Sequence, residues 1–193
     1  MIMSTAEEQK KIEAIAGHIR SIMELLGEDT SREGLLKTPM RAAKALWYVT
    51  EGTRTHDHAD VLRQALFTHE GSRMIIVKDI EFYSMCEHHI LPFFGRISVG
   101  YIPRGKIVGL SKLARIVDAH ARRLQVQERL TADLCRDISR ALDAEGVIVL
   151  CNAPHLSMNM RGVEKQDSST TSVEYVGVFE SDPSLRREFF DSL

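Results

Sequence analysis

The chain places one thiol and two imidazoles within four residues, in the run SMCEHH at residues 84–89. Zinc accepts thiolate and imidazole ligands, and a catalytic zinc keeps three protein ligands and a water. Alternate side chains of an extended chain share a face, so Cys86 and His89 converge only if the chain turns at Glu87. Such a turn leaves His88 free for proton transfer. Cys86 and His89 alone do not complete a metal site. The run therefore also fits the polar end of a strand with no metal.

A second polar segment, HLSMNMR at residues 155–161, alternates polar and apolar side chains. Read as a strand, it carries its polar side chains on one face and Leu156, Met158 and Met160 on the other. The polar face comprises His155, Ser157, Asn159 and Arg161. A strand of this kind suits the wall of a substrate pocket, and it equally suits any half-exposed strand.

Two further segments carry charge at the expected starts of helices. In GLSKLAR, Ser111 is a candidate helix N-cap, and a helix N-terminus attracts anions. Lys112 and Arg115 add positive charge there, which suits a phosphate, although a capped surface helix gives the same pattern. In LQVQER, Gln127 and Glu128 taken alone are polar residues near the start of a helix.

The surrounding pattern predicts helices and paired strands. Apolar residues at three- and four-residue steps predict a helix over residues 6–26, and a second helical segment runs from 31 to 52 with a restart at Pro39. The remaining expected elements are strands at 74–85, 97–102, 147–151, 155–160 and 173–179 and helices at 111–117, 125–144 and from 183. Strands in adjacent pairs favour an α+β fold with an antiparallel sheet. We expect a helical extension over 1–70 and a catalytic part over 71–193.

Composition excludes several classes of protein. Apolar residues make up 44% of the 193 residues, and the net charge is −2, so we expect neither a nucleic-acid partner nor a membrane partner. No stretch approaches the ~18 apolar residues of a membrane span, and the N-terminus lacks the apolar core of a signal peptide. The three cysteines do not suggest a disulfide framework. These features predict a cytoplasmic protein.

Taken together, these motifs resemble the GTP cyclohydrolase I family. The matching text is SREGLLKTPMRAAKAL, SMCEHH, GLSKLARIVD, RLQVQERL, HLSMNMRG and SVEYVGVF, in this order over residues 10–190. The resemblance implies a tunnelling fold (T-fold) whose subunits assemble into a ring, here a homodecamer of two pentamers with sites between subunits. It implies hydrolytic opening of GTP to 7,8-dihydroneopterin triphosphate and formate, the first step toward folate or tetrahydrobiopterin.

The resemblance also implies roles for individual residues. Cys86 and His89 match zinc ligands, and His88 and His155 match catalytic histidines. Glu128 and Gln127 match contacts to guanine. Ser111 matches both a catalytic residue and a phosphate contact. The other matched triphosphate and ribose contacts are Lys112, Arg115 and Arg161, with Arg41 and Lys44 from a neighbouring subunit.

One position departs from the family pattern. The third zinc ligand of the family is a cysteine two residues after the catalytic histidine, and this chain has Ser157 there. A serine hydroxyl is a weak neutral donor, and zinc prefers thiolate. Cys151 lies six residues upstream, about 20 Å along an extended strand. The sequence therefore leaves three hypotheses: an enzyme with a weaker or different metal shell, a GTP-binding but hydrolysis-impaired variant, or a regulatory paralogue.

Overall fold

The structure is a computed structural model that describes residues 5–54, 59–162 and 164–193. The chain forms two compact units, Met1–Thr50 and Glu51–Leu193. The sequence analysis divided the chain between residues 70 and 71 into a helical extension and a catalytic part. That functional division stays a prediction.

The first unit is a pair of helices, α1 (Ala6–Leu25) and α2 (Thr38–Val49). Thr5 caps α1 and forms a capping box with Glu8. The expected restart at Pro39 is confirmed, since this proline lies in the first turn of α2, where its missing N–H costs no hydrogen bond. The apolar stripes pack around Ile12, Ala16 and Ala43.

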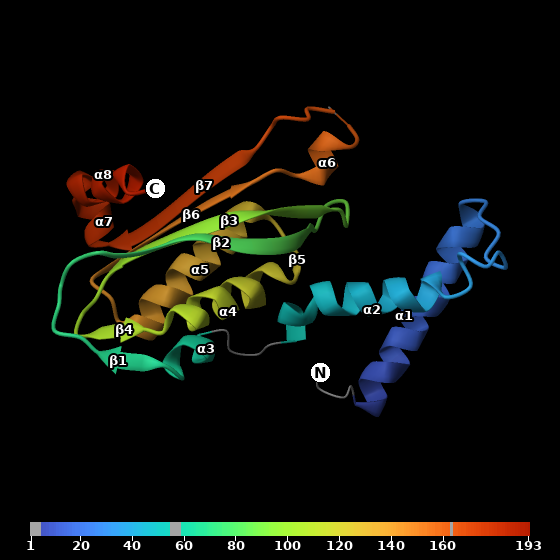
Figure 1. Cartoon of the computed structure of the whole chain (residues 1–193), viewed down its shortest axis with the longest axis horizontal. Coiled ribbons are helices and arrows are strands. Elements are labelled where there is room, and N and C mark those ends of the chain that lie inside the picture. The colour runs from blue at the N-terminus through green and yellow to red at the C-terminus, as the bar shows by residue number, and fades with distance from the viewer. Residues whose placement is uncertain (1–4, 55–58, 163) are drawn as a thin grey trace. The chain divides into compact units, whose positions relative to one another are not determined.

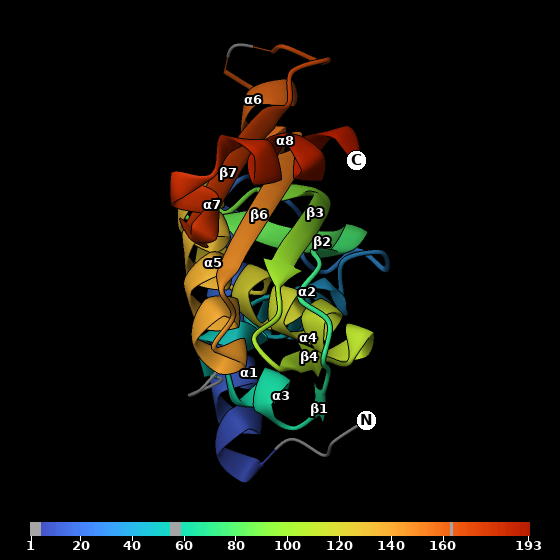
Figure 2. The ribbon, with the colours of Figure 1, turned by 90° about the vertical axis from the view of Figure 1, so that its left-hand side faces the viewer.

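The second unit contains a five-stranded sheet with helices on both of its faces (Figures 1 and 2). The strands of the second unit are β1 (Leu66–Thr68), β2 (Ile75–Cys86), β3 (Pro92–Ile102), β4 (Lys106–Val108), β5 (Leu124–Gln125), β6 (Gly146–Ala153) and β7 (Thr170–Gly177). Its helices are the 3₁₀ turn η1 (Glu51–Arg54), α3 (Asp60–Arg63), α4 (Leu110–Ala121), α5 (Gln127–Leu142), α6 (Leu156–Asn159), α7 (Val178–Ser181) and α8 (Pro183–Asp191).

The main sheet has the strand order β5-β2-β3-β6-β7, and β1 pairs with β4 in a separate small sheet. All pairs in the main sheet are antiparallel except β2 with β5, which pair in parallel through Met85–Leu124 and Cys86–Gln125. A bulge interrupts β2 between Val77 and Ile80, with Asp79 at φ 57°. The expected α+β fold with an antiparallel sheet is thus present, and the short parallel pair brings the end of β2 beside the start of α5.

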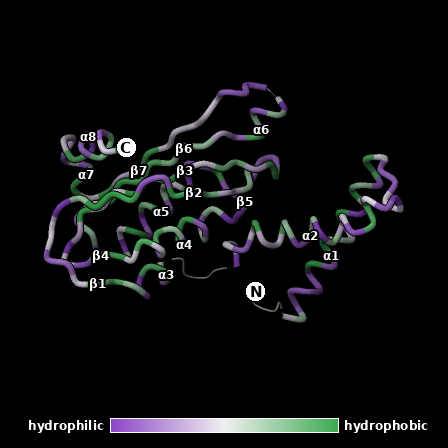
Figure 3. The backbone as a smooth tube through the Cα atoms, viewed as in Figure 1, coloured by the Kyte–Doolittle hydropathy of each residue, from purple (hydrophilic) through white to green (hydrophobic). Residues whose placement is uncertain are grey.

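The two faces of the sheet bury different helices. Helices α4 and α5 cover one face, where Phe82, Phe93 and Val149 of the sheet meet Ile116 and Leu134 of the helices (Figure 1). The other face carries α7 and α8, whose Phe179 and Phe189 pack on Ile102 and Ile148. The sheet strands form the most hydrophobic stretch of the backbone in Figure 3. Burial on both faces fixes the register of the strands that end at the candidate site.

The structure corrects several local expectations. Residues 31–37 form turns rather than a helix, and residues 178 and 179 begin α7 instead of ending the last strand. Ser111 is not the N-cap of its helix, because α4 begins one residue earlier and is capped by Gly109, whose backbone is extended. The strand expected over residues 155–160 is wrong: β6 ends at Ala153, and the chain turns into the short helix α6. Pro154 offers no N–H to continue the ladder with β7, whose pairing with β6 stops at Ala153–Thr170. No helix among the described residues is long and apolar enough to cross a membrane.

Candidate functional site

The turn between β2 and β3 positions the thiol and two imidazoles of the candidate site. The Ile90 N–H donates to Cys86 O at 2.8 Å, and the Cys86 N–H donates to Leu91 O at 2.8 Å. Ile90 sits at φ 54°, a left-handed conformation that β-branched residues rarely adopt. The expected turn is therefore present, but the side-chain contact within it joins Cys86 to His88, the histidine that the sequence analysis left free, and not to His89. Within it, Cys86 Sγ lies 3.9 Å from His88 Nδ1, and the His88 and His89 rings are 6.2 Å apart.

Four segments far apart in the sequence line one hollow of about 310 Å³. The β2–β3 turn, the start of α5, the start of α6 and Thr170 of β7 each contribute. The sequence-predicted residues in its lining are Cys86, His88, His89, Gln127, Glu128, His155 and Ser157. These are the metal-ligand, proton-transfer and guanine-contact candidates, and the fold brings all of them together in one chain. Their roles stay predictions.

Gln127 is the most enclosed member of this group. Its side chain begins α5 and is 1% exposed. Its Nε2 donates to Cys151 O at 3.0 Å and to Thr170 O at 2.9 Å, and it lies 3.1 Å from Ser172 Oγ. Its Oε1 lies 2.9 Å from His155 Nε2. Both ends of the amide thus bind protein groups from β6, β7 and the start of α6.

His155 is half-buried, and its ring stacks on the buried ring of Phe93 with centroids 4.7 Å apart and planes 2° apart. Burial lowers the pKa of His155 below its usual value, and the nearby Glu128 carboxylate partly opposes this effect. With a lowered pKa the imidazole is more often neutral near pH 7, so it can accept a proton as a base and gives it up readily once protonated. Glu128 itself is exposed at the rim of the hollow.

The correction at α6 changes how the segment 155–161 presents its side chains. His155 is the N-cap of α6, and the helical turn directs Ser157 and Met158 to the hollow. Asn159 instead points into the loop, where its Nδ2 donates to Gln166 O at 2.6 Å. Arg161 is exposed beyond α6 and does not line the hollow. The four polar side chains that the sequence placed on one strand face are therefore divided between different environments.

A metal would find suitable donor types here but few of them. Among the residues that the structure describes, no group of three His, Cys, Asp or Glu side chains is arranged to hold a metal ion. Ser157 adds only a hydroxyl to the thiol and imidazoles of the turn. Burial raises the pKa of Cys135 and of Cys151 to about 12, so neither thiol is available as a thiolate ligand. The donor types fit zinc, but with His88 reserved for proton transfer Cys86 and His89 are one strong donor short of a catalytic site.

The candidate phosphate contacts lie outside the hollow. Ser111 is exposed in the first turn of α4, and Lys112 Nζ donates to Gln64 Oε1 at 3.0 Å. Arg115 lines a different hollow, of about 350 Å³, beside the ion-paired Arg122. Arg41 and Lys44 are exposed on α2 in the first unit. Within the described residues of the second unit, Ser111, Lys112, Arg115 and Arg161 do not line the hollow that holds the imidazoles.

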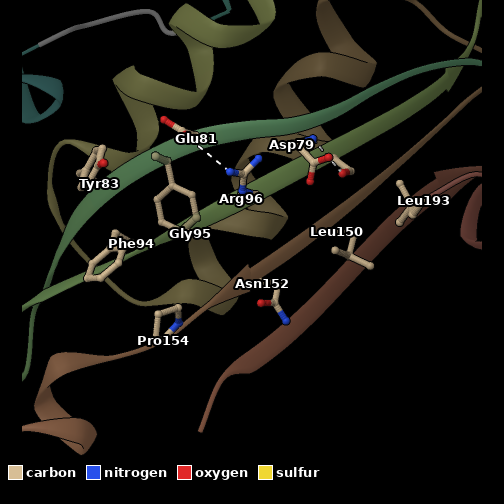
Figure 4. Close-up of a pocket in the computed structure, with 12 residues that line it drawn as sticks. Asp79, Glu81, Tyr83, Phe94, Gly95, Arg96, Leu150, Asn152, Pro154 and Leu193 are labelled. Atoms are coloured by element: carbon tan, nitrogen blue, oxygen red, sulfur yellow. Dashed lines mark hydrogen bonds and ion pairs between the residues drawn. The ribbon is translucent and has the colours of Figure 1, made fainter. Parts of the chain in front are cut away.

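A larger hollow of about 600 Å³ lies on the open part of the sheet, on the face opposite α4 and α5 (Figure 4). Tyr83 and Phe94 stack there with centroids 5.9 Å apart, and Arg96 pairs with Glu81 at 3.4 Å. None of the sequence-predicted site residues lines it. Size alone therefore does not identify the site, and the chemistry favours the smaller hollow.

Sequence reasoning missed two residues that hold the site together. The Gln125 side chain is buried, donates to His120 O at 3.2 Å and accepts from Arg129 Nε at 2.7 Å. Arg129 also pairs with Glu87 in the β2–β3 turn. Both residues lie within the RLQVQERL motif, which was a signal, but their contacts depend on the parallel β2–β5 pair, which no local pattern predicts.

Comparison with known proteins supplies the family. The model of the family described as GTP cyclohydrolase I matches residues 15–193. A protein of Porphyromonas gingivalis named GTP cyclohydrolase 1 is 50% identical over 189 residues, covering 98% of this chain and 97% of the relative. A Deinococcus radiodurans protein of that name is 53% identical over 174 residues, covering 90% and 80%. A Saccharomyces cerevisiae protein of that name is 48% identical over 187 residues, covering 97% and 76%. The chain therefore belongs to the GTP cyclohydrolase I family.

Proposed function

We propose that this chain hydrolyses GTP, opening its imidazole ring to give 7,8-dihydroneopterin triphosphate and formate. The observation that carries the proposal is the single hollow that joins Cys86, His88, Glu128 and His155 from three separate segments. Family membership over residues 15–193 supports the same activity. The comparisons do not support a hydrolysis-impaired variant or regulatory paralogue, because the matched relatives carry the name of the enzyme.

The histidines and the carboxylate have complementary roles in the proposal. C8 of guanine is a poor electrophile, and protonation of N7 makes it more reactive. His88 and His155 are the candidates for that proton transfer. Glu128 accepts hydrogen bonds from the N–H edge of guanine, which distinguishes it from adenine, whose edge has the reversed pattern. Its exposure at the rim leaves the carboxylate accessible to a base that enters the hollow.

We assign the metal to the β2–β3 turn, because the family is generally zinc-dependent. Cys86 and His89 would hold Zn²⁺, with Ser157 in the third position as a weak donor or with water completing the shell. When bound, the metal supplies a water of lowered pKa for attack on the purine ring. The chain itself orients the base between Glu128 and His155 and shields one side of the hollow with Met158.

Assembly completes the site in this proposal. Ser111, Lys112, Arg115 and Arg161 contact the triphosphate and ribose, and Arg41 and Lys44 reach the phosphates from a neighbouring copy. Several cations around one triphosphate give strong charge-assisted binding. That Lys112, Arg115 and Arg161 of the same unit do not line the hollow of a single chain supports a site shared between subunits. We propose a T-fold ring, a homodecamer of two pentamers.

The test is release of formate and dihydroneopterin triphosphate from GTP, with and without added zinc or iron(II), in the unmodified chain and in Ser157→Cys. Turnover that depends on added metal, and that Ser157→Cys makes less dependent, is the expected result. If neither chain turns over GTP under any metal condition, the proposed activity is wrong. Bound GTP without turnover in the unmodified chain, with turnover restored by Ser157→Cys, would favour the hydrolysis-impaired alternative. GTP binding compared with ATP binding tests Glu128 separately.

A further inference from the structure

The Gln127 amide has only one orientation that satisfies its neighbours. Cys151 O and Thr170 O, at 3.0 and 2.9 Å from one end of the amide, are carbonyl oxygens and can only accept hydrogen bonds. The NH₂ group must therefore face them, since a carbonyl facing two carbonyls in a buried position would leave all three without donors. The amide oxygen consequently faces His155.

This orientation determines which nitrogen of His155 carries a proton. Gln127 Oε1 is an acceptor without a hydrogen, so His155 Nε2, at 2.9 Å, must be the donor. In the neutral ring the lone pair then belongs to Nδ1. Among the described residues, no hydrogen bond to His155 Nδ1 occurs. Nδ1 is therefore the ring atom left to exchange a proton with a bound molecule.

Two further contacts keep the ring in place. The buried Phe93 ring lies parallel to the imidazole, with the centroids 4.7 Å apart, and so blocks rotation out of the plane. The backbone of His155 caps α6, with its carbonyl accepting from the N–H groups of Met158 and Asn159 at 2.9 and 3.0 Å. Rotating the ring would break the bond to Gln127 and leave a buried amide oxygen unpaired, which is costly.

We propose that Gln127 is a positioning residue that fixes the Nε2–H tautomer of His155, so that Nδ1 is the atom that transfers the proton to and from the substrate. This inference rests on the proposed function for the identity of the substrate. It differs from the family-based expectation for Gln127, which is a contact to guanine. In the forward step the Nδ1–H bond of the imidazolium breaks, N7 of guanine gains the proton, and the ring returns to the neutral Nε2–H tautomer.

The direct test is the tautomer itself. The full-length protein, labelled with ¹⁵N-histidine, is examined by long-range ¹H–¹⁵N correlation at a pH where the ring is neutral, with the His155 signals assigned by their loss in His155→Asn. We expect an unprotonated Nδ1 and a protonated Nε2. A dominant Nδ1–H tautomer in the unmodified protein would overturn the proposal without reference to activity.

Two variants of matched length separate the acceptor from the shape of the side chain. Gln127→Met removes the acceptor, and we expect a mixture of tautomers. Gln127→Glu keeps an acceptor for Nε2 in either protonation state, and we expect the Nε2–H tautomer to persist. Ser172→Ala is the control, because Cys151 O and Thr170 O still orient the amide. An unchanged tautomer in a folded Gln127→Met protein would contradict the proposal.

Kinetics distinguish positioning from recognition of the base. A positioning role predicts that Gln127→Met lowers kcat by ~10- to 100-fold with little change in the KM for GTP, because an outer contact orients a catalytic group. A guanine contact predicts instead a raised KM and weaker discrimination against ATP, with the tautomer intact. If the unmodified protein has the Nε2–H tautomer but does not turn over GTP, the proposed function fails while the tautomer assignment stands.

Discussion

Two histidines of the second unit are each held at Nε2 by a side chain of α5, and their partners differ in charge. His120 on α4 lies 3.1 Å from Asp137 Oδ2, and their side chains are 2% and 8% exposed. His155 lies 2.9 Å from the amide oxygen of Gln127 and borders the candidate site. The first contact is between two buried ionisable groups, whereas the second has a neutral acceptor.

Under the proposed function, the difference separates a structural contact from a contact to a proposed catalytic group. Asp137 also pairs with Arg136 and Arg140, so its carboxylate ties α4 to a charged network on α5. Gln127 contributes no charge, so the charge on His155 depends on burial, on Glu128 and on what enters the hollow. A histidine that must gain and lose a proton in each turnover is better served by a neutral partner that only orients it.

The largest expected effect is on turnover at His155. His155→Asn should lower kcat for formate release by ~10²- to 10⁴-fold, the usual contribution of a general acid or base. The matched control is His120→Asn, which should keep kcat close to the unmodified value because His120 does not line the hollow. Equal losses in the two variants, measured in samples with the same circular dichroism, would remove the distinction between the two histidines.

The second-largest expected effect is on the stability of the folded protein when Asp137 is replaced. Asp137→Ala removes a buried acceptor shared by His120, Arg136 and Arg140, and should lower the free energy of unfolding by ~1–3 kcal/mol. Urea unfolding followed by circular dichroism measures it. Asp133→Ala is the control on the same helix, because Asp133 pairs with the exposed Arg136 and a pair of this kind contributes ~0–1 kcal/mol. A loss at Asp137 no larger than that at Asp133 would argue against a structural role.

Sequence reasoning found most of the residues in the site but not how they are held. The CEHH turn, the start of α5 and His155 were all recognisable as motifs, and local periodicity gave α1, α4 and α5. The segment after His155 was misread because alternation of polar and apolar residues over six positions also fits a short helix and loop. The family resemblance matched Gln127 to a guanine contact, and no local pattern shows that β6 and β7 supply carbonyls to its amide.

A third contact from α5 reaches the β2–β3 turn and has an intermediate expected effect. Arg129 pairs with Glu87, whose neighbours Cys86 and His88 line the hollow. Glu87→Gln weakens this pair while keeping the shape of the side chain, and should lower activity by about 10-fold through a less well-oriented turn. The measurement is kcat for formate release at saturating metal and GTP. The control is Glu81→Gln, which weakens a more exposed pair with Arg96 outside the site.

The smallest expected effect, and the most direct comparison of neutral and charged partners, is in the pH dependence of stability. The folded-state pKa of His155 is below its unfolded value of 6.5, so the unfolded chain binds more protons between these two values. The contribution of His155 to the free energy of unfolding is therefore complete above pH 6.5 and is lost as the pH falls through the folded-state pKa. The measurement is the free energy of unfolding of the unmodified protein and of His155→Asn between pH 7.5 and 5. The difference between the two curves gives the contribution of His155.

Gln127→Glu gives His155 the kind of partner that His120 has. An ionised carboxylate at this position loses the two hydrogen bonds to Cys151 O and Thr170 O but favours the imidazolium, so the folded-state pKa of His155 should rise and the pH dependence attributed to it should shrink or change sign. The matched background is the double variant Gln127→Glu with His155→Asn, which removes the titration of the new carboxylate from the difference. If the difference curve keeps its original sign and size, the charge of the α5 side chain does not determine the pKa of His155. The proposed distinction between His155 and His120 is then wrong.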